Sequence, residues 1–230
     1  MKKQTSGRNT EKQSIMDKVI ELIKQILVAV IIYLFISTTT IKATQIYSGS
    51  MEDTLLVGDL LFINKFIYGI KIPYTDIRLP SLKDPKQGDI VVFKYPKDES
   101  VNYVKRCVAV EGQTVKIKDK VLYIDGIPFS NTEGIKYTRP SLPPNYIESD
   151  IFPAGNGNRD NYGPVAIPKG YLFMMGDNRD NSFDSRYWGF MPKKNIVGKP
   201  IIIYWSWNKE IPYWDIFHKV RWSRIGTLPD

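Results

Sequence analysis

The stretch YSGSM (47–51) places two serines on either side of a glycine, and Ser50 is a candidate nucleophile. A serine hydroxyl attacks a carbonyl efficiently only when a neighbouring base removes its proton. The usual base, histidine, occurs once in the chain, as His218, in an aromatic tail that offers it no evident orienting carboxylate. Either the stretch is an ordinary turn, or Ser50 is served by a base of another type.

The stretch NYVKRCVAV (102–110) supplies a candidate base in Lys105. Alternate side chains of a strand share a face, so Lys105 points the same way as Tyr103. If that face is buried, a fall of the lysine pKa from about 10.4 to about 8 corresponds to roughly 3 kcal/mol against the charged form. The alternative is a surface lysine on a strand whose other face, with Val104 and Arg106, is buried. The strand pattern alone favours neither.

The segment MGDNRDNSFDSRYWGF (175–190) concentrates polar side chains between two apolar ends. Arg179 stands two positions after Asp177, where a calcium loop needs an oxygen ligand, so the pattern argues against calcium. A solvated acidic loop is one alternative. The apolar ends favour a structured, hydrogen-bonded turn. In such a turn Asp184 and Arg186 can pair, and Ser182 can orient a neighbouring amine.

Four sequence blocks together resemble the bacterial signal peptidase I family, membrane-anchored enzymes that remove signal peptides from exported preproteins. In order, the blocks are SGSM with TLLVGD, GDLLFINKFIYGIK, GDIVVFKYP with YVKR, and MGDNRDNSFDSRYWGF; the closing VRWSRIG also fits. They cover most of residues 44–113 and 164–206, and the last block is highly specific. The resemblance implies a serine endopeptidase that works through an acyl-enzyme, without a metal or other cofactor.

The resemblance also implies roles for individual residues. Ser50 becomes the nucleophile and Lys105 the general base, while the Ser48 hydroxyl and the Ser50 amide form the oxyanion hole. Ser182 is implied to hydrogen-bond the Lys105 amine. The residues implied to hold the shape of the site are Gly176, Asp177, Asp184 and Arg186. The residues implied to line pockets for small substrate side chains are Ile46, Met51, Leu55, Tyr103 and Val104.

Three positions depart from the family pattern. Tyr47 stands where many members have proline, Glu52-Asp53 replaces a commoner Met-x-Pro, and VEGQT (110–114) replaces an LPGD-like turn. These changes concern pocket shape and loop rigidity rather than the reacting groups, so they bear on substrate preference.

The elements that must position these residues are mainly strands. Alternating apolar residues and turn signals predict strands at Leu60–Asn64, Asp89–Phe93, Tyr103–Val110, Thr114–Lys118, Val121–Ile124 and Tyr171–Met175. The run PIIIYWSW (200–207) predicts a buried strand, and IDGIP (124–128) predicts a tight turn. We therefore expect a mainly β protein: one N-terminal transmembrane helix, then an antiparallel β-sheet catalytic ectodomain with a small inserted β subdomain.

Composition gives the expected domain boundaries. Pro, Gly and Asn enrich residues 128–168, which predicts long loops or an inserted subdomain. We expect a short cytoplasmic N-terminus at 1–18, an anchor helix at 19–41, a catalytic β domain at 42–113 and 165–230, and a smaller β and loop insert at 114–164. The tail 208–230 alternates aromatic and basic residues, which suits either a lipid interface or a packed tail.

The anchor prediction rests on residues 25–41, which carry no charge. As a helix they span roughly 26 Å, close to the hydrocarbon thickness of a bilayer. A cleavable signal peptide and a buried core helix are the alternatives. Six Lys or Arg residues precede the segment, and only Lys42 lies in the twenty residues after it. This bias predicts a single-pass protein of the bacterial cytoplasmic membrane, with its N-terminus inside and its catalytic domain on the extracytoplasmic side.

The net charge of +8 and the pI near 9.3 are compatible with a nucleic-acid partner or an anionic membrane. The sequence has no basic recognition-helix pattern or zinc-finger spacing, so we expect no nucleic acid. A single cysteine, Cys107, excludes an intrachain disulfide. The expected partners are signal peptides of exported preproteins and the lipid bilayer. The sequence leaves the oligomeric state open, with a monomer expected.

Two other functions remain open at this point. The chain could be a non-catalytic tethered β-domain that binds peptides at the cell envelope. It could also be a Ser-Lys protease that cleaves itself; self-processing repressors of that kind carry a DNA-binding domain, for which residues 1–45 show no pattern.

Overall fold

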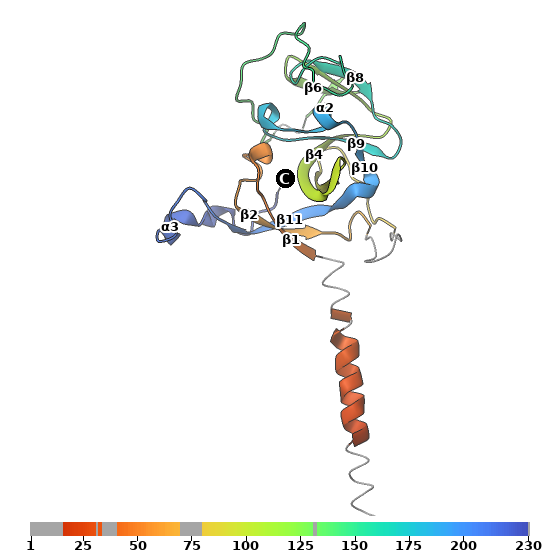
Figure 1. Ribbon diagram of the computed structural model, residues 1–230, viewed down its shortest axis with the longest axis vertical. Helices are drawn as coiled ribbons and strands as arrows, with labels where there is room; N and C mark the ends of the chain where they lie inside the picture. Colours follow the sequence, from red (N-terminus) through yellow and green to blue (C-terminus); the bar gives the residue numbers. More distant parts are fainter. Residues whose placement is uncertain (1–15, 31, 34–40, 70–79, 131–132, 230) are drawn as a thin grey trace, which may run out of the picture. The chain divides into compact units, whose positions relative to one another are not determined.

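The computed structural model describes residues 16–30, 32–33, 41–69, 80–130 and 133–229 (Figure 1). The chain divides into two compact units, Met1–Thr40 and Ile41–Asp230. In the first unit, residues 16–30 and 32–33 are helical. Among the described residues, no helix combines the length and apolarity needed to cross a bilayer. Part of the predicted anchor, at 31 and 34–40, lies outside the described residues, so the transmembrane helix stays a prediction.

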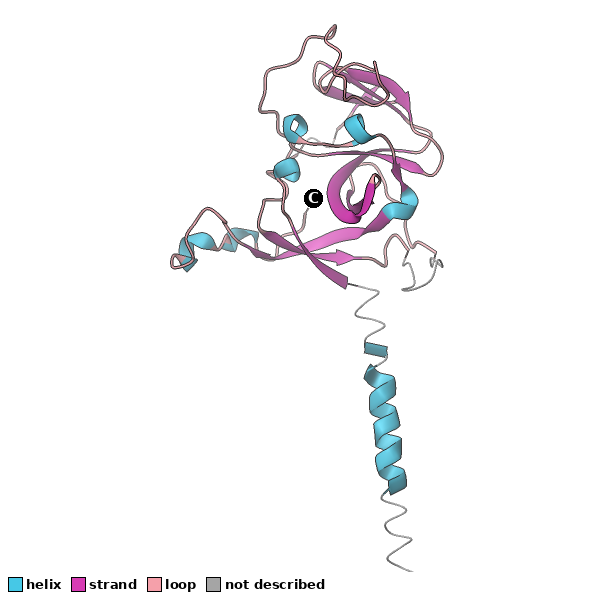
Figure 2. Cartoon of the chain, in the orientation of Figure 1, coloured by secondary structure: helices cyan, strands magenta, loops and turns pink. Residues whose placement is uncertain are grey.

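The second unit is built mainly from antiparallel strands, as predicted (Figure 2). Its larger sheet has seven strands in the order β1-β2-β11-β3-β4-β9-β10. Their bounds are β1 Ile41–Gln45, β2 Asp59–Asn64, β3 Ile90–Tyr95, β4 Asp98–Val110, β9 Tyr171–Met175, β10 Met191–Pro192 and β11 Ile196–Ser206. The long strand β4 pairs with β3 up to Arg106 and with β9 from Arg106 to Val110, so the two pairings meet at Arg106.

A second sheet has four strands in the order β7-β6-β5-β8. Their bounds are β5 Thr114–Lys118, β6 Val121–Ile124, β7 Ile127–Pro128 and β8 Tyr162–Ala166. Asp125 and Gly126 both have positive φ, 52° and 81°, as a two-residue hairpin turn of mirror-image type requires. The predicted turn at 124–128 is therefore confirmed. The domain boundaries at 114 and 164 stay a prediction.

Short helices connect the strands and carry much of the polar chemistry. They are η1 Gly49–Met51, η2 Arg179–Asn181, α2 Ser185–Trp188, η3 Lys193–Asn195, α3 Ile216–Lys219 and η4 Trp222–Arg224. With lengths of three or four residues, they depend on their surroundings for stability, because isolated helices this short do not persist in water.

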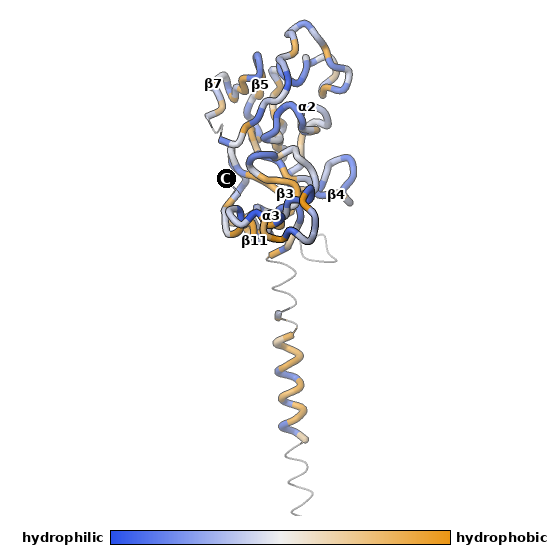
Figure 3. The backbone as a smooth tube through the Cα atoms, turned by 90° about the vertical axis from the view of Figure 1, so that its left-hand side faces the viewer, coloured by the Kyte–Doolittle hydropathy of each residue, from blue (hydrophilic) through white to orange (hydrophobic). Residues whose placement is uncertain are grey.

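The predicted strands lie at the expected positions, and the errors concern where the strands begin and end. β5, β6 and β9 have the predicted bounds, and β4 begins five residues earlier, at Asp98 rather than Tyr103. Residues 200–206 of the predicted strand belong to β11, which is strongly apolar (Figure 3), and Trp207 lies just beyond its end. β11 is not a fully buried strand: Ile203 and Ser206 are buried, whereas Ile201, Ile202 and Tyr204 are half-buried. Two register shifts against β2 interrupt the regular pairing of this strand.

Three apolar clusters form the core of the second unit. The cluster that concerns the site comprises Ile46, Met51, Leu55, Leu61, Ile90 and Ile203, with Val104 packed against it. It joins β2, β3 and β11 to the short helix η1. Burying Met51 and Leu55 on either side of the turn therefore anchors that helix to the sheet.

The carboxylate of Asp59 ties the sheet to the C-terminal tail. It is fully buried, accepts hydrogen bonds from Ser206 Oγ (2.6 Å) and the Leu56 amide (2.8 Å), and pairs with Arg224 (2.7 Å). The tail is thus packed at Arg224, while Tyr213, Trp214 and Phe217 are highly exposed. Contact of these exposed aromatic residues with a lipid interface stays a prediction.

We predict that Asp59→Asn lowers the free energy of unfolding by about 2–4 kcal/mol, because the partly buried Arg224 loses its counter-charge. Denaturant unfolding of the variant measures this. Asp84→Asn, at an exposed aspartate, is the matched control and should change stability by less than about 0.5 kcal/mol. Equal stability of the two variants would contradict the role given to Asp59.

Candidate active site

Ser50 and Lys105 line the same cavity, which has a volume of about 610 Å³. Its walls come from four separate parts of the sequence, at 45–51, 101–105, 139 and 180–183 with Tyr187. Of the predicted residues, those that line it are Ser48, Ser50, Lys105, Ser182, Ile46, Met51, Tyr103 and Val104. Leu55 is fully buried beneath η1 and is not part of the wall, so a direct role in a pocket is not supported for it.

Ser50 is held in η1, immediately after the backbone leaves the sheet. The Ile46 amide bonds the Asp59 carbonyl (2.9 Å), and the Leu55 amide bonds the Met51 carbonyl (2.6 Å), so the turn is fixed at both ends. The side chain of Ser50 is largely buried, and Ser50 Oγ lies 3.4 Å from Ser48 Oγ. The two serine hydroxyls therefore face a common point in the cavity.

Lys105 lies in the middle of β4 and is only 4% exposed. Its Nζ donates a hydrogen bond to Ser182 Oγ at 3.1 Å. Arg106 is buried as well, so both faces of this strand are covered and the choice between a buried and an exposed lysine is resolved. Among the described residues no hydrogen bond joins Lys105 to Ser50 directly, although both groups contact the same cavity.

Burial lowers the pKa of Lys105 from its ordinary value of 10.5 to about 8. The nearby carboxylates of Asp184 and Asp177 act in the opposite direction, and the Arg186 charge lowers the pKa further. About one tenth of this amine is consequently uncharged at pH 7 and about half at pH 8, which makes the uncharged form accessible to act as a general base.

A hydrogen-bonded chain runs behind the lysine, from Ser182 to Asp184 to Arg186. The Ser182 hydroxyl donates its hydrogen to the Asp184 carboxylate. The lone pairs of Ser182 Oγ are then free to accept the hydrogen bond from the Lys105 amine. Arg186 grips the same carboxylate through Nε (2.9 Å) and Nη2 (2.8 Å). Burial alone would raise the pKa of Asp184, but the Arg186 charge and these hydrogen bonds lower it. Asp184 is therefore ionised and fixes the direction of Ser182.

A second buried ion pair braces the other side of the site. Asp177 is fully buried and accepts two hydrogen bonds of 2.8 Å from the guanidinium of Arg106, the neighbour of Lys105 on β4. Thr54, in the loop after η1, donates to the same carboxylate at 2.6 Å. Asp177 thus connects β4 to the segment that carries Ser50.

Gly176 is required by the space available at its position. A Cβ added there would lie 2.3 Å from Ser182 Oγ and 2.4 Å from the Ser50 carbonyl oxygen, distances at which atoms overlap. Only glycine therefore lets β9 approach both Ser50 and Ser182. This gives a physical reason for the position that the resemblance implied.

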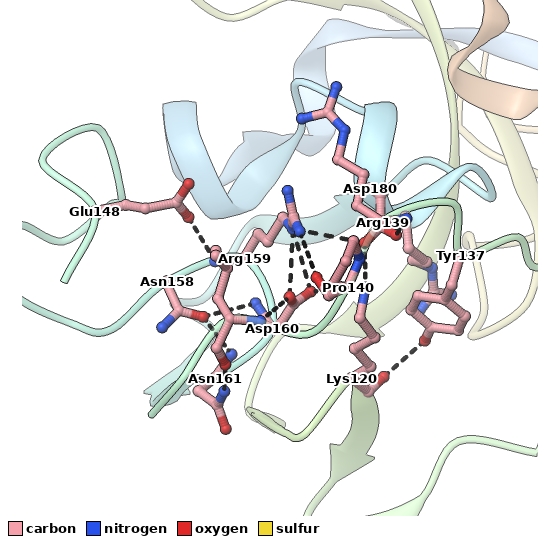
Figure 4. Close-up of polar contacts among 12 residues, drawn as sticks. Lys120, Tyr137, Arg139, Pro140, Glu148, Asn158, Arg159, Asp160, Asn161 and Asp180 are labelled. Atoms are coloured by element: carbon pink, nitrogen blue, oxygen red, sulfur yellow. Dashed lines mark hydrogen bonds and ion pairs between the residues drawn. The ribbon is translucent and has the colours of Figure 1, made fainter. Parts of the chain in front are cut away.

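An ionic cluster around Asp180 holds one wall of the cavity in place (Figure 4). Lys120 Nζ lies 2.7 Å from Asp180 Oδ1, and the amides of Thr138 and Arg139 donate to Oδ2 at 2.7 Å each. Arg159 adds a weaker contact at 3.6 Å. Asp180 and Arg139 both line the cavity. The sequence marked Asp180 only as part of a polar loop, because its partners are distant in the chain.

Asn178 is another site residue that the sequence did not single out. Its amide donates to the Ser50 carbonyl at 3.1 Å, and its Nδ2 donates to the Gly49 carbonyl at 3.2 Å. The signal was its place in the segment 175–190, but nothing in that segment identifies η1 as its partner.

Two expectations about other residues need correction or qualification. His218 does have a carboxylate beside it: its Nδ1 lies 2.7 Å from Asp215 Oδ1. The pair is exposed on α3 and is absent from the cavity wall, so histidine is not the base for Ser50. Tyr47 is three-quarters exposed and forms part of the wall, so its effect on substrate preference stays a prediction.

We predict that Lys105→Met raises the free energy of unfolding at pH 7 by about 1–3 kcal/mol, because it removes a cation that burial disfavours. The unfolded lysine binds a proton more tightly than the folded one, so this gain should shrink as the pH rises from 8 towards 10.5. Denaturant unfolding at several pH values measures it. Lys118→Met, on an exposed β5 lysine, is the control. A variant no more stable than the parent at pH 7 would contradict the buried-amine assignment.

Comparison with known proteins identifies the family. The family model described as signal peptidase, peptidase S26 matches residues 19–205. The chain is 36% identical over 222 residues to signal peptidase I of Pseudomonas fluorescens, covering 86% of this chain and 75% of that protein. It is 36% identical over 233 residues to signal peptidase I of Buchnera aphidicola subsp. Acyrthosiphon pisum, covering 80% and 74%.

Among solved structures, a signal peptidase I from Enterococcus faecalis V583 is 28% identical, covering 51% of this chain and 97% of that one, with a TM-score of 0.37. That score is too low for a comparison of folds, and the assignment rests on the sequence matches. Since the family model and the curated relatives span most of the chain, the protein belongs to the signal peptidases of peptidase family S26.

Proposed function

We propose that this member of the family is a membrane-anchored serine endopeptidase that cleaves N-terminal signal peptides, with Ser50 as nucleophile and Lys105 as general base. The observation that carries the proposal is the buried Lys105 amine, with a pKa of about 8, in the same cavity as Ser50. In the described part of the chain, no other side chain that lines this cavity is both buried and able to accept a proton near neutral pH.

In the first step, the neutral Lys105 amine takes the proton of Ser50 as Oγ attacks the scissile carbonyl. The amine is already oriented, because Ser182 and Asp184 fix its direction from behind. The contact between a catalytic base and its nucleophile, here Lys105 and Ser50, is often long in a free enzyme and shortens when substrate binds. Arg106 cannot replace Lys105, since its guanidinium stays protonated.

The negative charge that develops on the carbonyl oxygen needs donors fixed in advance. The Ser50 amide and the Ser48 hydroxyl are the candidates, and the position of Ser48 Oγ 3.4 Å from Ser50 Oγ supports that choice. Loss of one such donor typically costs about 3–4 kcal/mol of barrier. The protonated Lys105 then gives its proton to the leaving amine, and the neutral amine later activates the water that releases the acyl-enzyme.

The substrate strand has a natural place beside β4. Arg106 is the first residue of β4 that pairs with β9, so residues 101–105 have no β9 partner and their backbone edge faces the cavity. An extended peptide can add to such an edge and direct alternate side chains into the wall. Ile46, Met51, Tyr103 and Val104 lie there and suit small apolar side chains. This arrangement fits cleavage after small residues at the last and third-last positions of a signal peptide.

The anchor is proposed from the sequence of residues 19–41 and the charges around it. Residues 16–30 and 32–33 are helical, which supports a helix in this region without establishing that it spans a bilayer. A single-pass tether would confine enzyme and preprotein to one membrane and raise their effective concentration.

We predict that Ser50→Ala and Lys105→Ala each lower preprotein cleavage in detergent by about a thousandfold or more. In the parent protein, kcat/KM should rise with pH and level off above a midpoint near 8, because only the uncharged Lys105 of the free enzyme accepts a proton. A serine-reactive acylating inhibitor should label Ser50 in the parent. A parent chain that is neither labelled nor active would indicate a non-catalytic peptide-binding domain. Full activity of either variant would contradict the proposed pair of Ser50 and Lys105.

We also predict that the full chain stays with the membrane fraction after an alkaline carbonate wash. A chain starting at Ile41 should be released, because it lacks the apolar segment. Protease added outside spheroplasts should digest residues 42–230 and leave the N-terminus intact. Release of the full chain by carbonate would contradict the anchor, and digestion of the N-terminus alone would reverse the topology.

A further inference from the structure

We propose that Lys136, together with Glu52 and Asp53, forms an electrostatic clasp that positions the turn carrying Ser50. The three residues are called the Lys136 clasp below. The inference rests on the proposed role of Ser50 and adds positioning residues to it. Glu52 and Asp53 are two of the positions at which this chain departs from the family pattern.

The backbone of Lys136 is fixed to the loop that supports the catalytic lysine. Its amide donates to the Asp177 carbonyl at 2.8 Å, and its carbonyl accepts from the Arg179 amide at 2.9 Å. Lys136 and Asn178 form an isolated parallel bridge between the two segments. The side chain therefore starts from a rigid point next to Asp177, the carboxylate that also contacts Arg106 and Thr54.

From that point the side chain of Lys136 reaches the turn after Ser50. Its Nζ lies 3.5 Å from Glu52 Oε2 and 3.6 Å from Asp53 Oδ1. All three side chains are partly exposed, so each ion pair is worth about 0–1 kcal/mol and is weakened by salt. The clasp consequently affects the position of the turn and contributes little to the stability of the fold.

Asn178 makes the position of Glu52 matter for Ser50. Its Nδ2 donates to both Glu52 Oε2 (3.0 Å) and the Gly49 carbonyl (3.2 Å), while its amide donates to the Ser50 carbonyl (3.1 Å). Asn178 is almost completely buried. Because the Glu52 carboxylate pairs with Lys136 and accepts a hydrogen bond from Asn178, a shift of Glu52 is passed to the carbonyls of Gly49 and Ser50.

The backbone of the turn shows why such a clasp suits this chain. Asp53 has φ of +78°, a left-handed conformation that proline cannot adopt and that aspartate tolerates. The turn therefore lacks the rigidity that a proline ring would give at this position. The Gly134 backbone also approaches closely, since a Cβ there would lie 2.4 Å from Thr54 Oγ1. The segment around Lys136 is thus packed against the turn that it contacts through charge.

The test uses the full chain in detergent and the variants Lys136→Met, Lys136→Arg, Glu52→Gln and the Lys136→Met/Glu52→Gln double variant. Glutamine keeps an oxygen acceptor for Asn178 and removes only the charge. We expect Lys136→Met to lower kcat by about two- to fivefold with KM unchanged. The rate at which the acylating inhibitor labels Ser50 should fall by the same factor. Lys136→Arg should keep both rates.

Two further comparisons separate positioning from general stability. The double variant should be no slower than the slower single variant, because both changes remove one interaction. Raising the NaCl concentration should lower kcat of the parent towards kcat of Lys136→Met. The kcat of Lys136→Met itself should not change with NaCl. Lys116→Met, on an exposed β5 lysine, is the control and should match the parent throughout.

The clasp is refuted if Lys136→Met labels and turns over like the parent, if the single effects are additive, or if the loss follows a lowered melting temperature. Failure of the proposed function looks different: the parent itself would show no cleavage that depends on Ser50. A parent that requires Ser50 but is indifferent to Lys136 overturns the clasp alone.

Discussion

The site depends on one unfavourable burial, that of the Lys105 amine. A pKa lowered from 10.5 to about 8 corresponds to roughly 3 kcal/mol against the charged form, which the rest of the fold must offset. Lys105 pairs with Val91 of β3 on one side, and the segment after β9 contacts its amine through Ser182, so the amine is almost completely buried. The packing that stabilises the protein therefore also lowers the pKa of this amine, and the burial that favours its uncharged form reduces stability at this residue.

Burying charges around that amine requires each of them to be paired. Asp177 is gripped by Arg106 and Asp184 by Arg186, each through two short hydrogen bonds. Paired in this way, the two carboxylates raise the pKa of Lys105 only in part, and burial remains the dominant influence. Removing either arginine would leave a buried carboxylate without its counter-charge, which costs several kcal/mol and would also favour protonation of Lys105.

The sequence predicted local structure well and long-range contacts poorly. Strands such as β5 and β6 show clean alternation and were placed to the residue, whereas the orientation of Lys105 was undecidable because the alternation rule assumes that one face of a strand is exposed. The residues of the segment 175–190 were recognisable through the family blocks. Their partners were not: Asn178 meets Gly49 from 129 positions away, and no local pattern encodes that contact.

Ser50 is held differently from Lys105, and the contrast has a physical reason. Lys105 is fixed by a long strand, but Ser50 lies on a three-residue helix that cannot be stable alone. The position of Ser50 is determined by burial of Met51 and Leu55, by the close approach of Gly176 just after β9, and by the hydrogen bond from the Asn178 amide. Each contact comes from a different segment, so the distance between hydroxyl and amine is set by how these segments pack. Substitutions far from Ser50 in the sequence can therefore change its reactivity without touching either reacting group.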